Sequence, residues 1–430
     1  NWLIVSKRLR RYSVRANNSI TLPDFFSNRF REKNKHIMLL SALFILIFFT
    51  VYAASCFVTC GKLFSTLFGT SYQAMLIVGA VFVLVYTLLG GFLAESISDF
   101  MQAIVMITAL TVIVIIGVVK AGGIGSIIDN AQQIPGFLEF FGLATPAVDE
   151  TGKQLLEAGK PVFGAAADYG ILTIFSMMAW GLGYFGMPQV LLRFMAIRKE
   201  EELKRSRRIA MVWVVISLAV AVFIGIVGRQ LFPDALLTKS SAESIFITMS
   251  QSFLPPILAG FVMAGILAAT ISSSDSYLLI AASAFSKNVF QGVFKKNASD
   301  KQVMTVSRIT LLVLTAIGIV IALDENSVIF EIVSFAWAGF GATFGPIMIF
   351  SLFWKRVNKP GAIAGMISGA FMVFFWKLVL SKIGGVFAIY ELLPAFIFSS
   401  VCIVVVSLLT KAPSKEIEED FEAVRAGKCE

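Results

Sequence analysis

The chain has 430 residues, of which 57% are hydrophobic and only 15% are charged, and 40 are phenylalanine. This composition excludes a soluble globular protein and predicts an all-α polytopic membrane protein. The net charge of +9 does not indicate a nucleic-acid partner, because the basic residues lie in short loops between apolar segments.

The N-terminal region is short of apolar residues. Residues 2–6 read as the last turn of a helix whose beginning is absent, so we expect the chain to lack its first helices. Residues 7–36 are predicted to be a polar, very basic loop. Within it, residues 19–24 suggest a helix start, and Leu22-Pro23-Asp24-Phe25-Phe26 is typical of a short interfacial helix.

Ten apolar segments that follow are long enough to cross a bilayer. The segment at 253–286 is long for one crossing, and we expect it to tilt or bend after Pro255-Pro256. Residues 1–410 are therefore predicted to form one transmembrane domain, and residues 411–430 a solvated cytoplasmic tail. The predicted spans are 38–65, 73–93, 100–120, 169–192, 209–230, 253–286, 305–323, 329–353, 360–381 and 389–410.

The loops differ in charge. Alternate connections, together with the two ends, carry 28 of the 36 lysines and arginines. Because basic loops stay in the cytoplasm, the N-terminal loop and the C-terminal tail are predicted to be cytoplasmic in the plasma membrane. The external connection at 121–168 is acidic on balance, and it is predicted to be either a lid or short hairpin over a vestibule, or a passive connector.

The span at 171–192 has no charged residue, but three glycines and a proline interrupt it between Trp180 and Pro188. Each of these residues weakens a helix, and backbone freed from helical bonding is tolerated only inside protein or beside a wet cavity. With Trp180 and Tyr184 on one face, this break predicts a transporter's substrate site. The alternative is a glycine-rich packing face between helices.

A run of hydroxyl residues follows in the span at 253–286. Ala269, Ser272, Ser273 and Ser276 share one helical face, and Asp275 lies 60° from Ser272 around the helix. Hydroxyls and a backbone carbonyl can provide half of a coordination shell for a sodium-sized cation, and carbonyls of a broken helix can provide the rest. The alternative is that the serines form hydrogen bonds between helices.

Asp99 precedes the span at 100–120, where it either caps the helix or belongs to an ion pathway. Cys56 and Cys60 are one turn apart and are predicted to pack between helices, and the four cysteines, with Cys402 and Cys429, form no disulfide framework. No phosphate-binding loop, zinc motif or nucleophile motif occurs, so ATP and enzymatic chemistry are not indicated. Transport is expected to use a gradient or to be passive.

Several longer stretches resemble the sodium/solute symporter family, and within it the sodium/proline symporters most closely. The resemblance runs from the first residues to about residue 409, and its distinctive stretches are Leu22-Pro-Asp-Phe-Phe, Phe48-Phe-Thr-Val-Tyr52, Gly90-Gly-Phe-Leu-Ala, Trp180 to Pro188, Ser334 to Pro346, and Arg356 followed by Gly361-Ala-Ile-Ala-Gly. It implies a LeuT-type fold of two inverted repeats, N-terminally truncated, without the family's core helix 1. The spans at 169–192 and 253–286 then correspond to core helices 6 and 8.

The resemblance also implies roles for individual residues. It gives a proline site at Tyr52, Trp180, Tyr184 and Pro188, and a sodium site at Ala269, Ser272 and Ser273. Asp99 matches an acid important for sodium coupling, although Ile97-Ser98 replaces the commoner Trp-Thr before it. Ser276 and Asp275 fall where some members have a second ion site, and Tyr277 replaces a frequent glutamine.

The function implied is inward symport of L-proline with co-transported sodium, by alternating access. Symport of another amino acid or an organic acid, or a transporter-like sensor module, are the alternatives. With core helix 1 absent, we expect that residues 1–430 alone do not transport.

Overall fold

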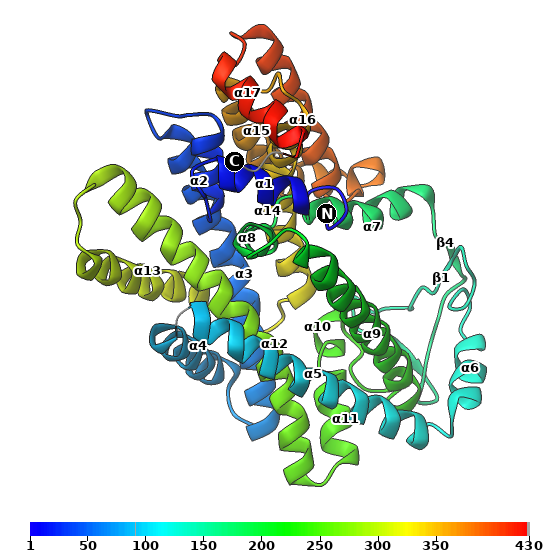
Figure 1. The fold of residues 1–430 in the computed structure, drawn as a ribbon. Coiled ribbons are helices and arrows are strands. Elements are labelled where there is room, and N and C mark those ends of the chain that lie inside the picture. Colours follow the sequence, from blue (N-terminus) through cyan, green and yellow to red (C-terminus); the bar gives the residue numbers. More distant parts are fainter. Residues whose placement is uncertain (91, 428–430) are drawn as a thin grey trace.

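The computed structural model describes residues 1–90 and 92–427, and residues 92–95 only as backbone. The described residues contain ten helices or helix pairs that are long and apolar enough to cross a membrane, in agreement with the ten predicted spans. They pack as one helical body, with both chain ends at the same side (Figure 1). The spanning elements are α3 (His36–Phe68), α4 (Tyr72–Leu89), α5 (Phe92–Lys120), α7 (Ile171–Gly183) with α8 (Pro188–Ala196), α9 (Glu202–Leu231), α12 (Pro256–Ser283) with η1 (Ala284–Phe294), α13 (Asp300–Ile321), α14 (Ile329–Phe353), α15 (Lys359–Leu378) and α16 (Leu392–Leu409).

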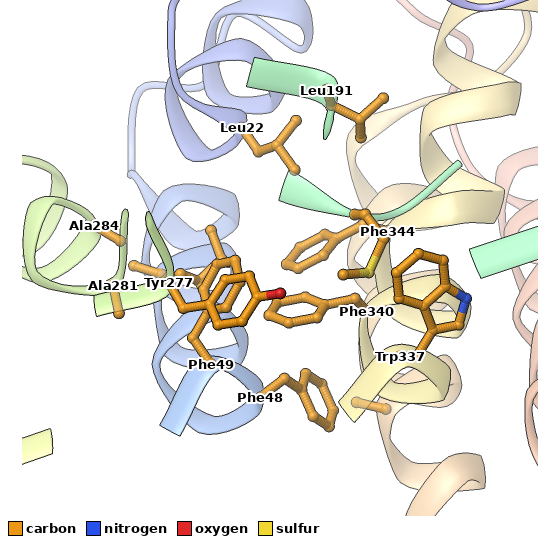
Figure 2. Close-up of a cluster of buried hydrophobic side chains, with 14 of the residues drawn as sticks. Leu22, Phe48, Phe49, Leu191, Tyr277, Ala281, Ala284, Trp337, Phe340 and Phe344 are labelled. Carbon is orange, nitrogen blue, oxygen red and sulfur yellow. The ribbon is translucent and has the colours of Figure 1, made fainter. Parts of the chain in front are cut away.

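The core lies between α3, α12 and α14. Helix α14 is the most enclosed span, with 72% of its apolar window buried. Its Phe340 packs against Phe49 of α3 with ring centroids 4.4 Å apart, and Phe49 stacks on Tyr277 of α12 at 5.3 Å (Figure 2). A helix that is apolar on every side is stable inside a bundle or in a membrane, and most of α14 is inside the bundle.

Helix α12 differs from the predicted span. It begins at Pro256 rather than at residue 253, because Pro255 and Pro256 occupy the start of the helix, where a missing N–H costs nothing. The prolines therefore mark the start of this helix. At its other end the chain continues as a wider π-helical segment, η1.

The N-terminal region is more ordered than predicted. Two helices, α1 (Ser6–Arg15) and α2 (Leu22–Arg29), replace the expected loop, and residues 2–5 form the turn that leads into α1. The predicted short helix at Leu22–Phe26 is present as α2, whose N-cap Thr21 accepts a hydrogen bond from the Asp24 N–H.

The C-terminal tail was also predicted wrongly. Residues Lys415–Arg425 form the helix α17, which packs on α1 and buries Ile417, Phe421 and Val424. The tail is thus a docked amphipathic helix rather than a solvated end.

The connection at 121–168 contains α6 (Ile124–Gln132), which packs on α9, and four two-residue strands. Strands β2 (Leu156–Glu157) and β3 (Lys160–Pro161) form the predicted short hairpin, and β1 (Gly142–Leu143) pairs with β4 (Ala167–Asp168). Ala158 and Gly159 both have positive φ, as a two-residue hairpin turn requires. Short connecting helices complete the fold: α10 (Lys239–Ala242), α11 (Ile245–Phe253), η2 (Leu380–Ile383) and η3 (Gly385–Ala388).

Cys56 and Cys60 are buried, free thiols on α3, and Cys60 packs against Gly79 of α4. The predicted packing role is confirmed. Cys429 and Gly91 lie outside the described residues.

Candidate functional site

The predicted break in the span at 171–192 is present. Helix α7 ends at Gly183, residues 184–186 form a turn, Met187 is extended, and α8 starts with Pro188 at its first position. Two glycines allow this segment to contact α14 closely. A Cβ on Gly183 would lie 1.9 Å from Nε1 of Trp337, and one on Gly186 would lie 2.2 Å from the carbonyl oxygen of Phe340.

Trp180 is the centre of an aromatic cluster at the end of α7. Its half-buried ring stacks on Phe330 at 5.4 Å, on Trp337 at 5.1 Å and on Tyr390 at 6.0 Å. The Nε1–H of Trp337 donates to the Trp180 carbonyl oxygen at 2.9 Å, and Tyr184 packs edge-on against Trp337 at 4.8 Å. Trp180 and Tyr184 therefore share one partner ring, beside backbone that has left the helix.

This arrangement suits a small zwitterion with an apolar ring. Aromatic faces bind apolar surface and attract an ammonium group, and backbone N–H and C=O groups of an interrupted helix can bind charged ends. The Tyr184 side chain is 39% exposed, so the cluster is accessible from one side.

Tyr52 belongs to a neighbouring site. Its ring stacks on Tyr277 at 4.2 Å, and both line a cavity of about 390 Å³ between α3, α5 and α12. Ala269 and Ser273 of α12 line the same cavity, together with Ser55 and Thr59 of α3. Ala269 and Ser273, two of the four residues on the predicted helical face, therefore line a cavity that the hydroxyl residues Ser55 and Thr59 also line.

The other predicted ion ligands lie differently. The Ser272 hydroxyl donates to the Ala269 carbonyl oxygen at 3.1 Å, and Ser272 does not line this cavity. Ser276 and Asp275 are buried, at 3% and 2% exposure, and Asp275 Oδ1 accepts the Ser276 N–H at 2.7 Å. The five predicted ligands on α12 therefore share a segment of the helix, but only Ala269 and Ser273 face the cavity.

Asp99 does not cap a helix. Helix α5 already begins at Phe92, which places Asp99 two turns inside it. Its Oδ2 pairs with Nη2 of Arg193 on α8 at 3.2 Å. Arg193 and Pro188 line a second cavity, of about 320 Å³, between α2, α8 and the end of α12. Pro188 and Asp99 therefore lie at α8, the second half of the broken helix. Neither belongs to the aromatic cluster or lines the cavity beside Ser273.

An ionic network lies at the far end of α3. Lys62 Nζ donates to the carbonyl oxygen of Ser327 at 2.8 Å and pairs with Glu243 Oε2 at 3.0 Å. The Glu243 carboxylate accepts the Ile329 and Phe330 N–H groups at 3.0 Å each, where an acid favours the start of α14. Because Phe330 stacks on Trp180, this network fixes one wall of the aromatic cluster.

Sequence reasoning missed three members of the cluster. Trp337 lies in the glycine-rich stretch 334–346, whose resemblance to the family does not indicate a role for this ring. The sequence around Phe330 and Tyr390 has no local feature that indicates a binding site. Tyr277 was noted only as a departure from the family pattern, yet it separates Tyr52 from the core.

Comparison with known proteins identifies the family. Residues 1–369 match the model of the sodium:solute symporter family. The chain is 39% identical to an osmoregulated proline transporter of Bacillus subtilis, over 96% of this chain and 79% of that protein. It is 40% identical to a sodium/proline symporter of Haemophilus influenzae, over 98% and 81%, and 38% identical to one of Escherichia coli, over 98% and 79%.

A solved structure confirms the fold. A sodium-coupled sialic acid symporter, described in a substrate-bound outward-open state, matches with a TM-score of 0.67 at 17% identity, over 96% of this chain and 87% of that one. The LeuT-type fold and a transporter rather than an enzyme, both expected from the sequence, are confirmed. The chain therefore belongs to the sodium:solute symporter family.

Proposed function

We propose that this protein carries L-proline into the cell together with sodium, by alternating access. The observation that carries the proposal is the aromatic cluster around Trp180 at the break between α7 and α8, in a chain about 40% identical to sodium/proline symporters. Sodium and proline are both cargo, and the sodium gradient supplies the driving force.

Proline would lie against the rings of Trp180 and Tyr184. The pyrrolidine ring would contact the aromatic faces, and its carboxylate and secondary ammonium would bind backbone groups of residues 184–187. Tyr52 would close the pocket from the α3 side, and Pro188, which has no N–H to donate, would hold the start of α8 beside this turn.

Sodium would bind at α12. The carbonyl oxygen of Ala269 and the hydroxyls of Ser272 and Ser273 are hard, neutral oxygen ligands, which suit a monovalent cation. Ser272 needs a rotation away from its present bond to the Ala269 carbonyl oxygen in order to contribute. Asp99, Ser276 and Asp275 are the further candidates, and we expect them to act in coupling or at a second ion site rather than in this shell.

The face that carries α1, α2 and α17 is assigned to the cytoplasm. The loops on that side hold most of the lysines and arginines, and α1 contacts α17, so the two ends lie together. Cysteine labelling of intact cells and inside-out vesicles tests this assignment.

The direct test is uptake by the purified full-length transporter in proteoliposomes. Labelled proline should accumulate only with an inward sodium gradient, and potassium in place of sodium should abolish accumulation. Equal accumulation with potassium would contradict sodium coupling. Sodium-driven uptake of another amino acid or of an organic acid, without proline uptake, would contradict the substrate.

Replacing Ser272 or Ser273 by alanine should weaken sodium activation. Each change removes one neutral ligand, so insertion in the membrane should stay intact, and the sodium half-saturation should rise by about fivefold or more, with the larger effect at Ser273. Proline affinity should fall at limiting sodium and recover at high sodium, because the two cargoes are thermodynamically linked. The measurement is proline uptake against sodium concentration.

Ser274→Ala is the matched control. Ser274 is fully buried on the same helix, its hydroxyl donates to the Ile271 carbonyl oxygen at 3.3 Å, and it does not line the cavity. It should leave the sodium curve unchanged. If both Ser272→Ala and Ser273→Ala also overlay the parent curve, the serine face is structural and the ion site lies at Asp99 or Asp275.

A further inference from the structure

The acidic helix α17 packs on the rest of the protein through an apolar face. This contact has no role in the transport cycle described above. Ile417, Phe421 and Val424 are spaced at i, i+4 and i+7, so they form one face, and each is at most 9% exposed. This face lies against α1 (Figure 1). The contact joins the two ends of the chain.

Phe421 contacts both arginines that hold the end of α14. The Arg8 guanidinium lies between the rings of Phe421, at 5.0 Å, and Phe353, the last residue of α14, at 4.8 Å. Arg29 Nε donates to the carbonyl oxygen of Ser351 at 3.2 Å, and its guanidinium lies 5.9 Å from the Phe421 ring. Movement of α17 would therefore alter the contacts of α14.

The outer part of the interface consists of ion pairs. The two oxygens of Asp420 bind Arg15 Nε and Arg31 Nη2, each at 2.8 Å. Glu416 binds Arg31 Nη1 at 2.7 Å, and this pair is the most exposed, at 66% and 47% of the two side chains. Pairs this close to solvent are weakened by salt.

Docking also has an unfavourable side. The Arg29 side chain is only 3% exposed, and neither of its terminal nitrogens has a hydrogen-bond partner in the described part of the chain. A buried, unsatisfied charged donor opposes the docked state, and burial lowers the pKa of this guanidinium. The aromatic contacts with Tyr12 at 4.9 Å and Phe30 at 5.2 Å offset this only in part. The salt-sensitive ion pairs thus lie beside a buried guanidinium whose terminal nitrogens have no described hydrogen-bond partner.

We propose that α17 is a salt-sensitive clamp that docks on α1 and α2, restrains the end of α14 through Arg8 and Arg29, and slows the transport cycle while it is docked. Rising ionic strength screens the Asp420 and Glu416 pairs and releases the helix. The effect on transport rests on the proposed function, whereas the docking equilibrium does not.

The docking equilibrium is tested by cysteine accessibility in the detergent-solubilised transporter. Val424→Cys places a thiol on the buried face, and Glu419→Cys places one on the exposed face of the same helix. The chain without an introduced cysteine gives the background. Between about 0.01 M and about 1 M KCl the Debye length falls from roughly 30 Å to roughly 3 Å. Maleimide labelling of Val424→Cys should accelerate by about tenfold or more over this range, whereas Glu419→Cys should stay fast throughout.

Asp420→Asn, combined with Val424→Cys, should give fast labelling already at low KCl. Glu418→Gln removes one charge from the same helix without removing a described ion pair, and it should retain slow labelling at low KCl. Slow labelling of Val424→Cys at every salt concentration, with and without Asp420→Asn, would overturn the proposal, because the helix would be permanently docked. Labelling as fast as that of Glu419→Cys at low KCl would overturn it as well, because the helix would not be docked.

The effect on transport is measured as sodium-driven proline uptake at constant sodium. Asp420→Asn at low KCl should raise the maximal rate by about twofold or more, toward the rate of the parent at high KCl, with an unchanged proline KM. Unchanged uptake kinetics together with fast labelling would overturn the role of the clamp in transport. Absence of proline uptake in every full-length variant, including the full-length parent, would contradict the proposed function and leave the labelling result valid.

Discussion

Replacing Gly186 by alanine is expected to abolish sodium-driven proline uptake and to lower the thermal stability of the transporter. A Cβ at this position would lie 2.2 Å from the carbonyl oxygen of Phe340 and 2.8 Å from the backbone nitrogen of Gly345. Both are backbone atoms of α14, the most buried span, so they cannot rotate away as a side chain does. The broken helix would have to separate from α14, at a cost of roughly 2 to 4 kcal/mol.

Gly181→Ala is the matched control for this prediction. No atom lies within 4 Å of the position that its Cβ would occupy, and Gly181 is exposed on α7. Because alanine is the better helix former, this variant should keep uptake and should gain up to about 1 kcal/mol of stability. Uptake and melting temperature are measured for both variants. Parental values for Gly186→Ala would show that the close contact between the break and α14 is not required.

The break itself could be predicted from sequence, but its partner could not. Glycines and a proline in an uncharged span are a local signal, and the structure confirms that α7 ends at Gly183. The ring that organises the site, Trp337, lies 157 residues downstream of Trp180. No local pattern reports such a pairing, because it depends on how α14 packs across the bundle.

The two docked amphipathic helices show a second limit. Residues 7–36 and 411–430 are rich in charge, and their few apolar residues were interpreted as loop and tail. Tyr12 in α1 and Phe421 in α17 are nevertheless buried, at 3% and 4% exposure, because each helix covers the other. Tertiary packing outweighs a weak local hydrophobic pattern in such short helices.

Helical spacing put the predicted ion ligands on one face, but the structure brings only some of them to one cavity. Ala269 and Ser273 line this cavity, whereas Ser276 is buried and does not line it. Which part of a face meets a cavity depends on the tilt of the helix and on its neighbours, and neither is local information. The start of α5 was also misplaced: Asp99 was interpreted as preceding the span, as a cap or as part of an ion pathway, but it lies within α5 and pairs with Arg193 of α8.

Truncating either aromatic ring at the break is expected to weaken proline binding strongly. Trp180→Ala removes a ring that stacks on Phe330, Trp337 and Tyr390, and Tyr184→Ala removes the edge contact to Trp337. The loss of at least one aromatic contact should raise the proline KM by more than about tenfold. The sodium half-saturation should change less, because neither residue lines the cavity beside Ser273.

Trp180→Phe separates binding from folding. A phenylalanine keeps an aromatic face toward Trp337 and leaves the Trp180 carbonyl oxygen, which accepts the Trp337 Nε1–H, in place. It should therefore recover most of the affinity that Trp180→Ala loses, at equal amounts of transporter in the membrane. Proline uptake is measured against proline concentration at saturating sodium for all three variants.

A KM that is unchanged in both alanine variants, with normal folding, would place the proline pocket elsewhere, with the cavity between Tyr52 and Ser273 as the next candidate. A KM that rises equally in Trp180→Phe and Trp180→Ala would instead assign the effect to the indole nitrogen or to ring size, because both variants retain the backbone of the break.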